Sequence, residues 1–299
     1  MKNQDKLLKK EKFSIAIKIV SKAPFIGRKI KERYFAYRNK KILNKLYPLL
    51  DDTYKTWLND KKINQTVTSP YIWFFWWQGV DKMPPLSQKC YRSLSKNKGK
   101  RKIIFISKYN VKKYAKLPDY IYSKVNDGRI SLTHFSDILR FNLLRQYGGL
   151  WVDATMYFTD SLDKYDTANK LFTCSGYIDK ANISEGRWTG FFIGGPAKSF
   201  IFVFMDEFFK KYWRYNSALI DYFLIDFALY FAWKKNIDNF RMVCKNNEKI
   251  APNMFKLQKL LNNTFSKSEW EELTQNTSAF KLSNRGILKY KEESYFSYL

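Results

Sequence analysis

SDILRFNLLRQYGGLWVDATMYFT, residues 136–159, is the stretch of sequence that decides the fold. Residues 136–147 carry apolar side chains at helical spacing, with polar side chains between them. Gly148 and Gly149 then end the predicted helix, because glycine adopts the left-handed conformation of a helix C-terminus without steric cost. Residues 150–152 follow as a short buried strand, and Asp153 comes where that strand stops.

Three charged side chains of this stretch are expected to converge. Asp137 and Arg140 are three residues apart and therefore share a face of the helix. The Gly-Gly turn brings the helix back beside the strand that ends at Asp153. Two carboxylates and a five-donor guanidinium suit the hydroxyls of a sugar and charge near a phosphate. Taken singly, Asp137 and Arg140 are explained by an ordinary ion pair on a helix, and Asp153 by an Asp at the end of a strand. The ordered combination of the three is more specific for a binding site.

The combination SDILR…GGLWVDAT resembles the core of the retaining, GT-A-type sugar transferases that carry a DXD motif. These include bacterial capsular polysaccharide synthesis proteins, yeast α-mannosyltransferases and clostridial glucosylating toxins. The capsular group is the most similar, since its members also have a Trp-rich first strand such as IWFFWWQG (residues 72–79), followed by MPPL (residues 83–86). The resemblance implies that Asp137 and Arg140 bind hydroxyls of the donor sugar.

The DXD motif departs from the usual pattern, because this chain has Asp153-Ala154-Thr155. In relatives the second Asp ligates Mn²⁺ or Mg²⁺ beside the donor diphosphate, as expected of a hard cation that prefers oxygen ligands. The Thr155 hydroxyl is a neutral and weaker ligand. The resemblance implies that Asp153 and Thr155 contact the donor and that Asp153 binds a divalent cation, Mn²⁺ or Mg²⁺.

The Trp-rich strand provides candidate contacts to the nucleotide base. Trp76, Trp77 and Gln78 come at the carboxyl end of a strand predicted over residues 71–77, and open α/β sheets bind ligands at that edge. The resemblance implies that Trp76 or Trp77 stacks on the base and that Gln78 makes polar contacts. Either tryptophan alone is explained equally well as a core aromatic residue.

Two carboxylates within the apolar segment DYFLIDFALYF are candidate catalytic residues. Asp221 and Asp226 fall on a helix predicted over residues 217–235. A carboxylate in an apolar helix is costly unless it is paired or functional. Related transferases place an Asp or Asn of this region against the acceptor or the reacting sugar, which favours Asp226. Asp221 is alternatively a group that stabilises the start of the helix.

The tail SAFKLSNRGILKY, residues 278–290, is similar to the closing segment of the capsular group. The resemblance implies a loop that closes over the donor diphosphate, with Lys281, Ser283 or Arg285 donating hydrogen bonds. Relatives often have a His where this chain has Phe280, so a metal-ligand role of the tail is not expected.

The order of elements predicts an α/β protein of the GT-A type. Further strands are expected over residues 102–107, 171–177 and 191–193, giving a mixed, mostly parallel central sheet with flanking helices. Residues 67–299 form the predicted catalytic domain with a helical C-terminal part, and residues 1–66 a basic helical N-terminal region. No GxGxxG and no GxxxxGK[ST] occurs, which disfavours the dinucleotide-binding and P-loop classes.

The charge balance points to anionic partners. The 299 residues carry a formal net charge of +27, which attracts nucleic acid, anionic lipid or acidic polysaccharide. Apolar residues among lysines over 15–26 fit either a helix lying on anionic lipid or a helix packed on the catalytic domain. No apolar run is long enough to span a bilayer. Three cysteines without CxxC spacing indicate neither a zinc site nor a disulfide framework. The expected location is the cytoplasm, at the inner face of the plasma membrane.

The resulting hypothesis is sugar transfer, with retention of configuration, from a nucleotide-sugar, most simply a UDP-sugar. The acceptor would be a growing cell-surface saccharide. A lipid-linked acceptor would suit an enzyme held at the inner leaflet by basic residues. Positive charge beside the departing diphosphate would come from a cation or from Lys and Arg groups. No nucleic-acid partner is expected. The alternatives are a non-enzymatic protein that binds polyanions, supported by the charge alone, and a degenerate transferase that binds donor without turnover.

Overall fold

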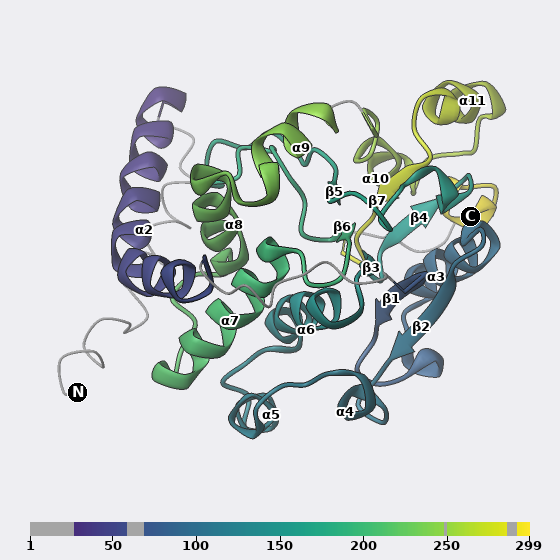
Figure 1. Ribbon diagram of the computed structural model, residues 1–299. Helices are drawn as coiled ribbons and strands as arrows, with labels where there is room; N and C mark the ends of the chain where they lie inside the picture. The colour runs from purple at the N-terminus through teal and green to yellow at the C-terminus, as the bar shows by residue number, and fades with distance from the viewer. Residues whose placement is uncertain (1–26, 59–68, 248–249, 286–291) are drawn as a thin grey trace.

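A mixed five-stranded sheet is the centre of the computed structural model, which describes residues 27–58, 69–247, 250–285 and 292–299 (Figure 1). The strand order is β2-β1-β3-β6-β5, with bounds β1 Tyr71–Phe75, β2 Lys102–Ile106, β3 Gly149–Val152, β5 Phe172–Thr173 and β6 Phe192–Gly195. Strands β2, β1 and β3 are parallel, whereas β6 is antiparallel to both β3 and β5. The predicted α/β class with a mixed sheet is confirmed, and the GT-A type stays a prediction.

Helices flank the sheet on both faces. Their bounds are α3 Pro85–Asn97, α4 Val111–Tyr114, α5 Asp119–Asn126, α6 Leu132–Tyr147, α7 Phe200–Tyr215, α8 Leu224–Lys235, α9 Phe240–Asn246, α10 Lys256–Leu260, α11 Lys267–Gln275 and α12 Tyr295–Tyr298. Successive side chains of a strand point to opposite faces. Trp73 of β1 accordingly joins one core with residues of α6 and α7, and Phe74 joins another with residues of α3 and β3.

A second, two-stranded ladder lies beside the central sheet. Strand β4, Met156–Phe158, follows β3 almost directly and pairs with β7, Ala279–Lys281, in antiparallel register. Met156 is opposite Lys281 in this register. The ladder therefore brings a residue from late in the chain next to the segment that follows β3.

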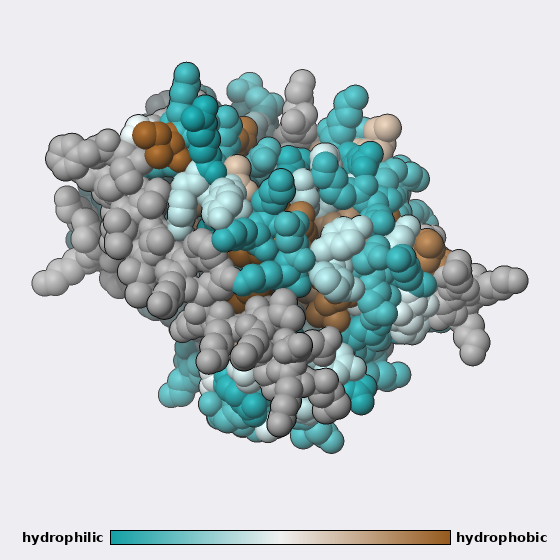
Figure 2. All heavy atoms as spheres, turned by 90° about the vertical axis from the view of Figure 1, so that its left-hand side faces the viewer, coloured by the Kyte–Doolittle hydropathy of each residue, from teal (hydrophilic) through white to brown (hydrophobic). Residues whose placement is uncertain are grey.

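The N-terminal helix α2, Arg28–Leu58, packs on α7 and α8. Ile42, Leu46 and Leu50 are buried in the same core as α6 and α7. Figure 2 shows that the described surface on this side is mostly hydrophilic, with scattered hydrophobic side chains. This part of the basic N-terminal region is a helix packed on the domain. The apolar set over residues 15–26 and the predicted boundary at residues 66–67 lie outside the described residues.

Three predicted elements are shorter in the structure by two residues or more. The strand predicted over residues 71–77 ends at Phe75, and the strand predicted over 171–177 is reduced to Phe172–Thr173. The helix predicted over 217–235 begins only at Leu224. Ahead of it, the Asp221 carboxylate accepts a hydrogen bond from the Phe223 backbone N–H at 2.9 Å. Such a local side-chain bond competes with helical hydrogen bonding and favours a turn.

The turn between α6 and β3 generates a prediction about stability. Gly149 has φ +93°, and a Cβ atom there would lie 2.5 Å from the Tyr71 carbonyl oxygen of β1. Because backbone strain and a backbone clash combine, Gly149→Ala should lower the free energy of unfolding by roughly 2–4 kcal/mol in urea denaturation.

Gly128→Ala is the matched control for this prediction. Gly128 also has positive φ, +78°, but no atom lies within 4 Å of its added Cβ. Gly128→Ala should therefore lower the free energy of unfolding only by the strain of the left-handed conformation, about 1–2 kcal/mol. Equal losses in the two variants would contradict the proposed role of close strand approach at Gly149.

Candidate functional site

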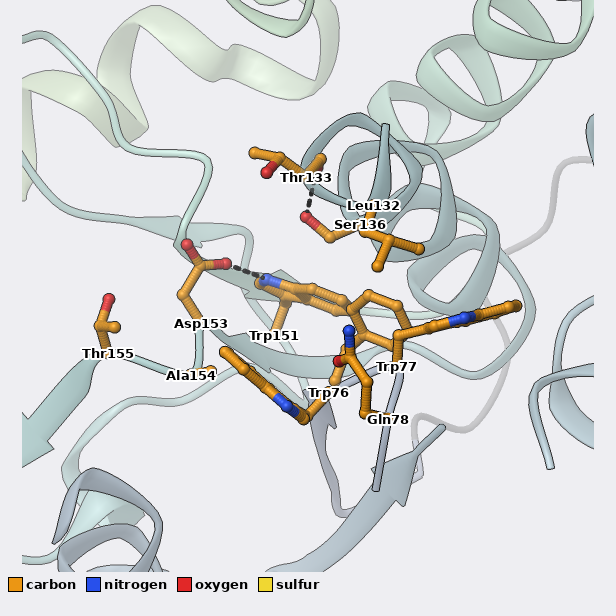
Figure 3. Close-up of a pocket in the computed structure, with 11 residues that line it drawn as sticks. Trp76, Trp77, Gln78, Leu132, Thr133, Ser136, Trp151, Asp153, Ala154 and Thr155 are labelled. Carbon is orange, nitrogen blue, oxygen red and sulfur yellow. Dashed lines mark hydrogen bonds between the residues drawn. The ribbon is translucent and has the colours of Figure 1, made fainter. Parts of the chain in front are cut away.

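The candidate site lies where the parallel strands β1 and β3 end side by side. Trp76 follows β1 directly, and Asp153 follows β3 directly. The carboxyl ends of both strands border a cavity of about 330 Å³, which Trp76, Trp77, Gln78, Asp153 and Thr155 help to line. The first turns of α6 contribute a further wall (Figure 3). The structure thus brings together these five residues that the sequence assigned to the donor.

The side chains of Trp76 and Trp77 extend in different directions. Trp76 extends toward Ala154 at the edge of the cavity (Figure 3), and its buried indole N–H has no hydrogen-bond partner in the part of the chain that the structure describes. Trp77 extends in another direction and makes edge contacts with Phe75 and Phe135. Both tryptophans line the cavity and pack against a hydrophobic core, so the unpartnered indole N–H is the feature that favours Trp76 as the ligand contact.

Arg140 joins the two predicted donor carboxylates. Its Nη1 lies 3.0 Å from Asp137 Oδ1, and its Nη2 lies 3.2 Å from Asp153 Oδ1. The guanidinium also lies over the Trp151 ring, 5.0 Å from its centroid, and its side chain is only 3% exposed. The convergence expected from the sequence is thus present, and Arg140 has its orientation fixed from three sides.

Asp153 is held as an ionised carboxylate. The Trp151 indole N–H donates to Oδ1 at 2.8 Å, and the Lys281 ammonium donates to Oδ2 at 3.0 Å. Burial by itself raises the pKa of Asp153, but the charges of Lys281 and Arg140 and these hydrogen bonds outweigh it, so that the pKa lies below its ordinary value. The site therefore keeps this negative charge across the physiological range of pH.

The C-terminal contribution to the site comes from a strand, which corrects the expected loop. Lys281 is the last residue of β7, and pairing with β4 fixes its position. Its ammonium also donates to Thr155 Oγ1 at 2.9 Å. The Ser283 hydroxyl instead accepts from the Arg285 backbone N–H at 3.1 Å, and the described contacts do not join it to the charged cluster. The predicted donor contact of Ser283 stays a prediction.

His134 lies next to Asp137 in the core. The Trp213 indole N–H donates to His134 Nε2 at 2.9 Å. An indole nitrogen is only a donor, so Nε2 accepts and the ring proton belongs on Nδ1, which lies 3.5 Å from Asp137 Oδ2. His134 is buried, and its Nδ1 makes no hydrogen bond among the described residues, so it is a core residue that lies next to the site.

Asp226 lies at the first turn of α8, close to the charged cluster. Its carboxylate accepts hydrogen bonds from Asn182 Nδ2 and from the Trp188 indole N–H, each at 3.0 Å. Burial raises the pKa of Asp226 to about 6, which those two hydrogen bonds oppose; Asp137 raises it and Arg140 lowers it. This carboxyl can therefore change its protonation state near neutral pH.

Asp221, the other candidate carboxylate, has a different environment. It forms an ion pair with Arg38 of α2, and both side chains are less than one-tenth exposed. The pair ties α2 to the turn ahead of α8. The catalytic role predicted for Asp221 stays a prediction, and the geometry gives it a structural function.

Several supporting residues were missed in the sequence. Trp151 had a usable signal, because side chains two apart on a strand share a face and Asp153 was already a candidate. Asn182 and Trp188 lie in an irregular segment without periodicity. Gly190 packs so closely that an added Cβ would lie 2.8 Å from Arg140 Nη1. A glycine in a loop carries no sequence signal for such a contact.

The oxygen ligands at Asp153 do not suit a divalent cation. Both carboxylate oxygens already accept from cationic groups, and the Thr155 hydroxyl accepts from Lys281. Among the described residues, no group of three or more His, Cys, Asp or Glu side chains is arranged to hold a metal ion. Mn²⁺ and Mg²⁺ prefer several oxygen ligands, usually with a carboxylate. The cation implied by the resemblance stays a prediction, and the residues present do not fit it.

Over residues 27–58, 69–247, 250–285 and 292–299, no helix combines the length and the apolar character required to cross a bilayer.

Comparison with known proteins relates the chain to proteins of saccharide synthesis. The family model described as capsular polysaccharide synthesis protein matches residues 22–299. An O-glycosyltransferase, braB, of Annulohypoxylon truncatum is 24% identical over 178 residues, which cover 54% of this chain and 42% of that relative. The matched region thus spans less than half the length of that curated relative.

The raised pKa of Asp226 predicts a pH-dependent stability. Between its ordinary pKa of 3.8 and about 6, the folded protein keeps a proton on Asp226 that the unfolded chain has released. The free energy of unfolding therefore falls as pH rises through this interval, by on the order of 3 kcal/mol. Asp226→Asn cannot ionise, so urea denaturation at pH 4 and pH 7 should show this loss in the wild type relative to the variant.

Asp160→Asn is the control for this measurement. Asp160 is exposed, and its pKa is lowered by the Ser161 backbone N–H and by Lys164. The Asp160→Asn variant should therefore still show the loss of stability between pH 4 and pH 7 that is attributed to Asp226. Parallel pH profiles of the wild type and Asp226→Asn would contradict a raised pKa at Asp226.

Proposed function

The chain belongs to the capsular polysaccharide synthesis protein family, and from this premise we propose that it is a glycosyltransferase that uses a nucleotide-sugar donor. The distant O-glycosyltransferase relative supports transferase activity in general. In the proposed reaction a sugar passes from a UDP-sugar to a growing cell-surface saccharide with retention of configuration, on a domain of the GT-A type.

The observation that carries this proposal is the position of the charged cluster. Asp137, Arg140, Asp153 and Lys281 are linked by contacts of 3.0–3.2 Å at the carboxyl edge of the sheet. The cavity beside them has Trp76 and Gln78 in its wall. An aromatic surface next to fixed charges suits a molecule that has a base at one end and a sugar diphosphate at the other.

In the proposed complex, Trp76 stacks on the base and Gln78 contacts its polar edge. Asp137 and Arg140 bind hydroxyls of the donor sugar. Because their mutual ion pair already fixes both side chains, donor binding requires little further ordering. Bond cleavage places negative charge on the departing diphosphate, and nearby cationic groups stabilise it.

The acceptor side of the reaction is assigned to Asp226. It lies close enough to Asp137 and Arg140 to interact electrostatically with both. With a pKa of about 6, its carboxylate is mostly ionised at neutral pH and can accept a hydrogen bond from the attacking hydroxyl. We propose that the acceptor attacks from the face that the diphosphate leaves.

The net positive charge suggests where the acceptor is found. A lipid-linked saccharide lies at an anionic membrane surface, which attracts a protein with a net charge of +27. We propose a peripheral location at the inner face of the plasma membrane.

The experiment that tests this function is hydrolysis and transfer of nucleotide-sugars by purified protein. UDP-glucose, UDP-galactose, GDP-mannose and CDP-activated sugars are offered, and release of the nucleoside phosphate is measured. Asp137→Asn should lower kcat/KM with the productive donor by about a hundredfold, because a charged hydrogen bond to the sugar is lost and Arg140 is left half-paired.

Asp127→Asn is the matched control, because Asp127 forms an exposed ion pair with Arg129 and should retain wild-type turnover. Urea denaturation checks that both variants fold. The absence of turnover with every donor, or equal activity of Asp137→Asn and the wild type, would contradict the proposal.

A further inference from the structure

We propose that the ammonium of Lys281 takes the place of the divalent cation and binds the donor diphosphate directly, which makes this transferase independent of metal. The inference rests on the proposed nucleotide-sugar function. It concerns the one position at which the sequence departs from the DXD motif.

The ammonium occupies the space between the two motif residues that would otherwise hold a cation. Lys281 Nζ lies 3.0 Å from Asp153 Oδ2 and 2.9 Å from Thr155 Oγ1. A divalent cation bound by the same two oxygen atoms would have to displace this ammonium. The Lys281 side chain is 21% exposed, so it is shielded but still accessible from solvent.

Lys281 is held in place by more than the two oxygen atoms. Its backbone belongs to the β4–β7 ladder, and its backbone N–H donates to the Met254 carbonyl at 2.9 Å. Its ammonium also lies over the Phe191 ring, 4.7 Å from the centroid. A cation that is already fixed needs no reorganisation when charge develops on a leaving group.

The charge balance explains why Thr155 accompanies Lys281. In this chain the carboxylates of Asp137 and Asp153 are balanced by Arg140 and Lys281. A DXD site with a second Asp, a divalent cation and no lysine has the same net charge of zero. An Asp at position 155 together with Lys281 and no metal would leave the site negative and would repel a diphosphate.

The ammonium also retains a donor for the ligand. An ammonium has three N–H groups, and among the described residues Asp153 and Thr155 accept two of them. The third can donate to a phosphate oxygen as a charge-assisted hydrogen bond. A lysine is a well-suited phosphate ligand in this geometry, because it acts as a compact point charge.

The first test measures nucleotide affinity by calorimetry on the full chain. UDP, GDP and CDP are titrated in the presence of EDTA and then with Mn²⁺. We expect one nucleotide to bind with an affinity that changes by less than about twofold between the two conditions. Lys281→Met keeps the apolar stem and removes the charge, and should weaken binding about ten- to a hundredfold.

Two further variants complete this test. Lys267→Met removes a lysine that is 85% exposed on α11 and should bind as the wild type does. Thr155→Asp combined with Lys281→Ala rebuilds the acidic motif, and its affinity should rise at least about tenfold when Mn²⁺ replaces EDTA. Should Lys281→Met not fold in urea denaturation, Lys281→Arg replaces it and should bind within about fivefold of the wild type, because it keeps the positive charge that attracts the diphosphate.

The possible results separate the two proposals. Binding by the wild type only in the presence of Mn²⁺ would overturn the inference and leave the proposed function standing. Binding in EDTA that is unchanged in Lys281→Met, or lost in Lys281→Arg, would overturn the role of Lys281. Failure of every nucleotide to bind in either condition would overturn both.

Discussion

A carboxylate that is partly removed from water is stabilised by pairing, because desolvating a charge is costly. Asp153 is stabilised in this way by one indole N–H, one guanidinium and one ammonium. Each partner comes from a different element: Trp151 from β3, Arg140 from α6 and Lys281 from β7. Pairing one charge thus fixes how the helix, the central sheet and the second ladder meet.

The part of this arrangement that lies close together in the sequence could be predicted from the sequence. The helix expected over residues 136–147 ends as predicted at Tyr147 but begins at Leu132, and the strand expected over residues 150–152 begins at Gly149 and ends as predicted at Val152. The ends were predicted because hydrophobic spacing and glycine chemistry are strong local signals. Because the strands before Trp76 and Asp153 are parallel, their ends meet, and the aromatic wall of the cavity follows from the same reasoning.

The parts that depend on distant pairing could not be predicted in the same way. Lys281 was expected in a loop, because a three-residue strand has too few side chains to show an alternating pattern. The short turn at Asp221 replaced two turns of predicted helix, since a side-chain hydrogen bond and an ion pair with α2 decided the local structure. Asn182 and Trp188, which hold Asp226, lie in a segment without any regular pattern.

The pairing of β4 with β7 has a consequence for the order of folding. The ion pair between Lys281 and Asp153 closes a chain segment with a sequence separation of 128 residues. Closing so long a loop costs entropy that is offset only once both ends are in place, so we expect this contact to form late. A collapsed intermediate that has formed the central sheet would still lack the Lys281 ammonium beside Asp153. An anionic ligand would then discriminate the finished protein from its precursors and would drive the last step by mass action.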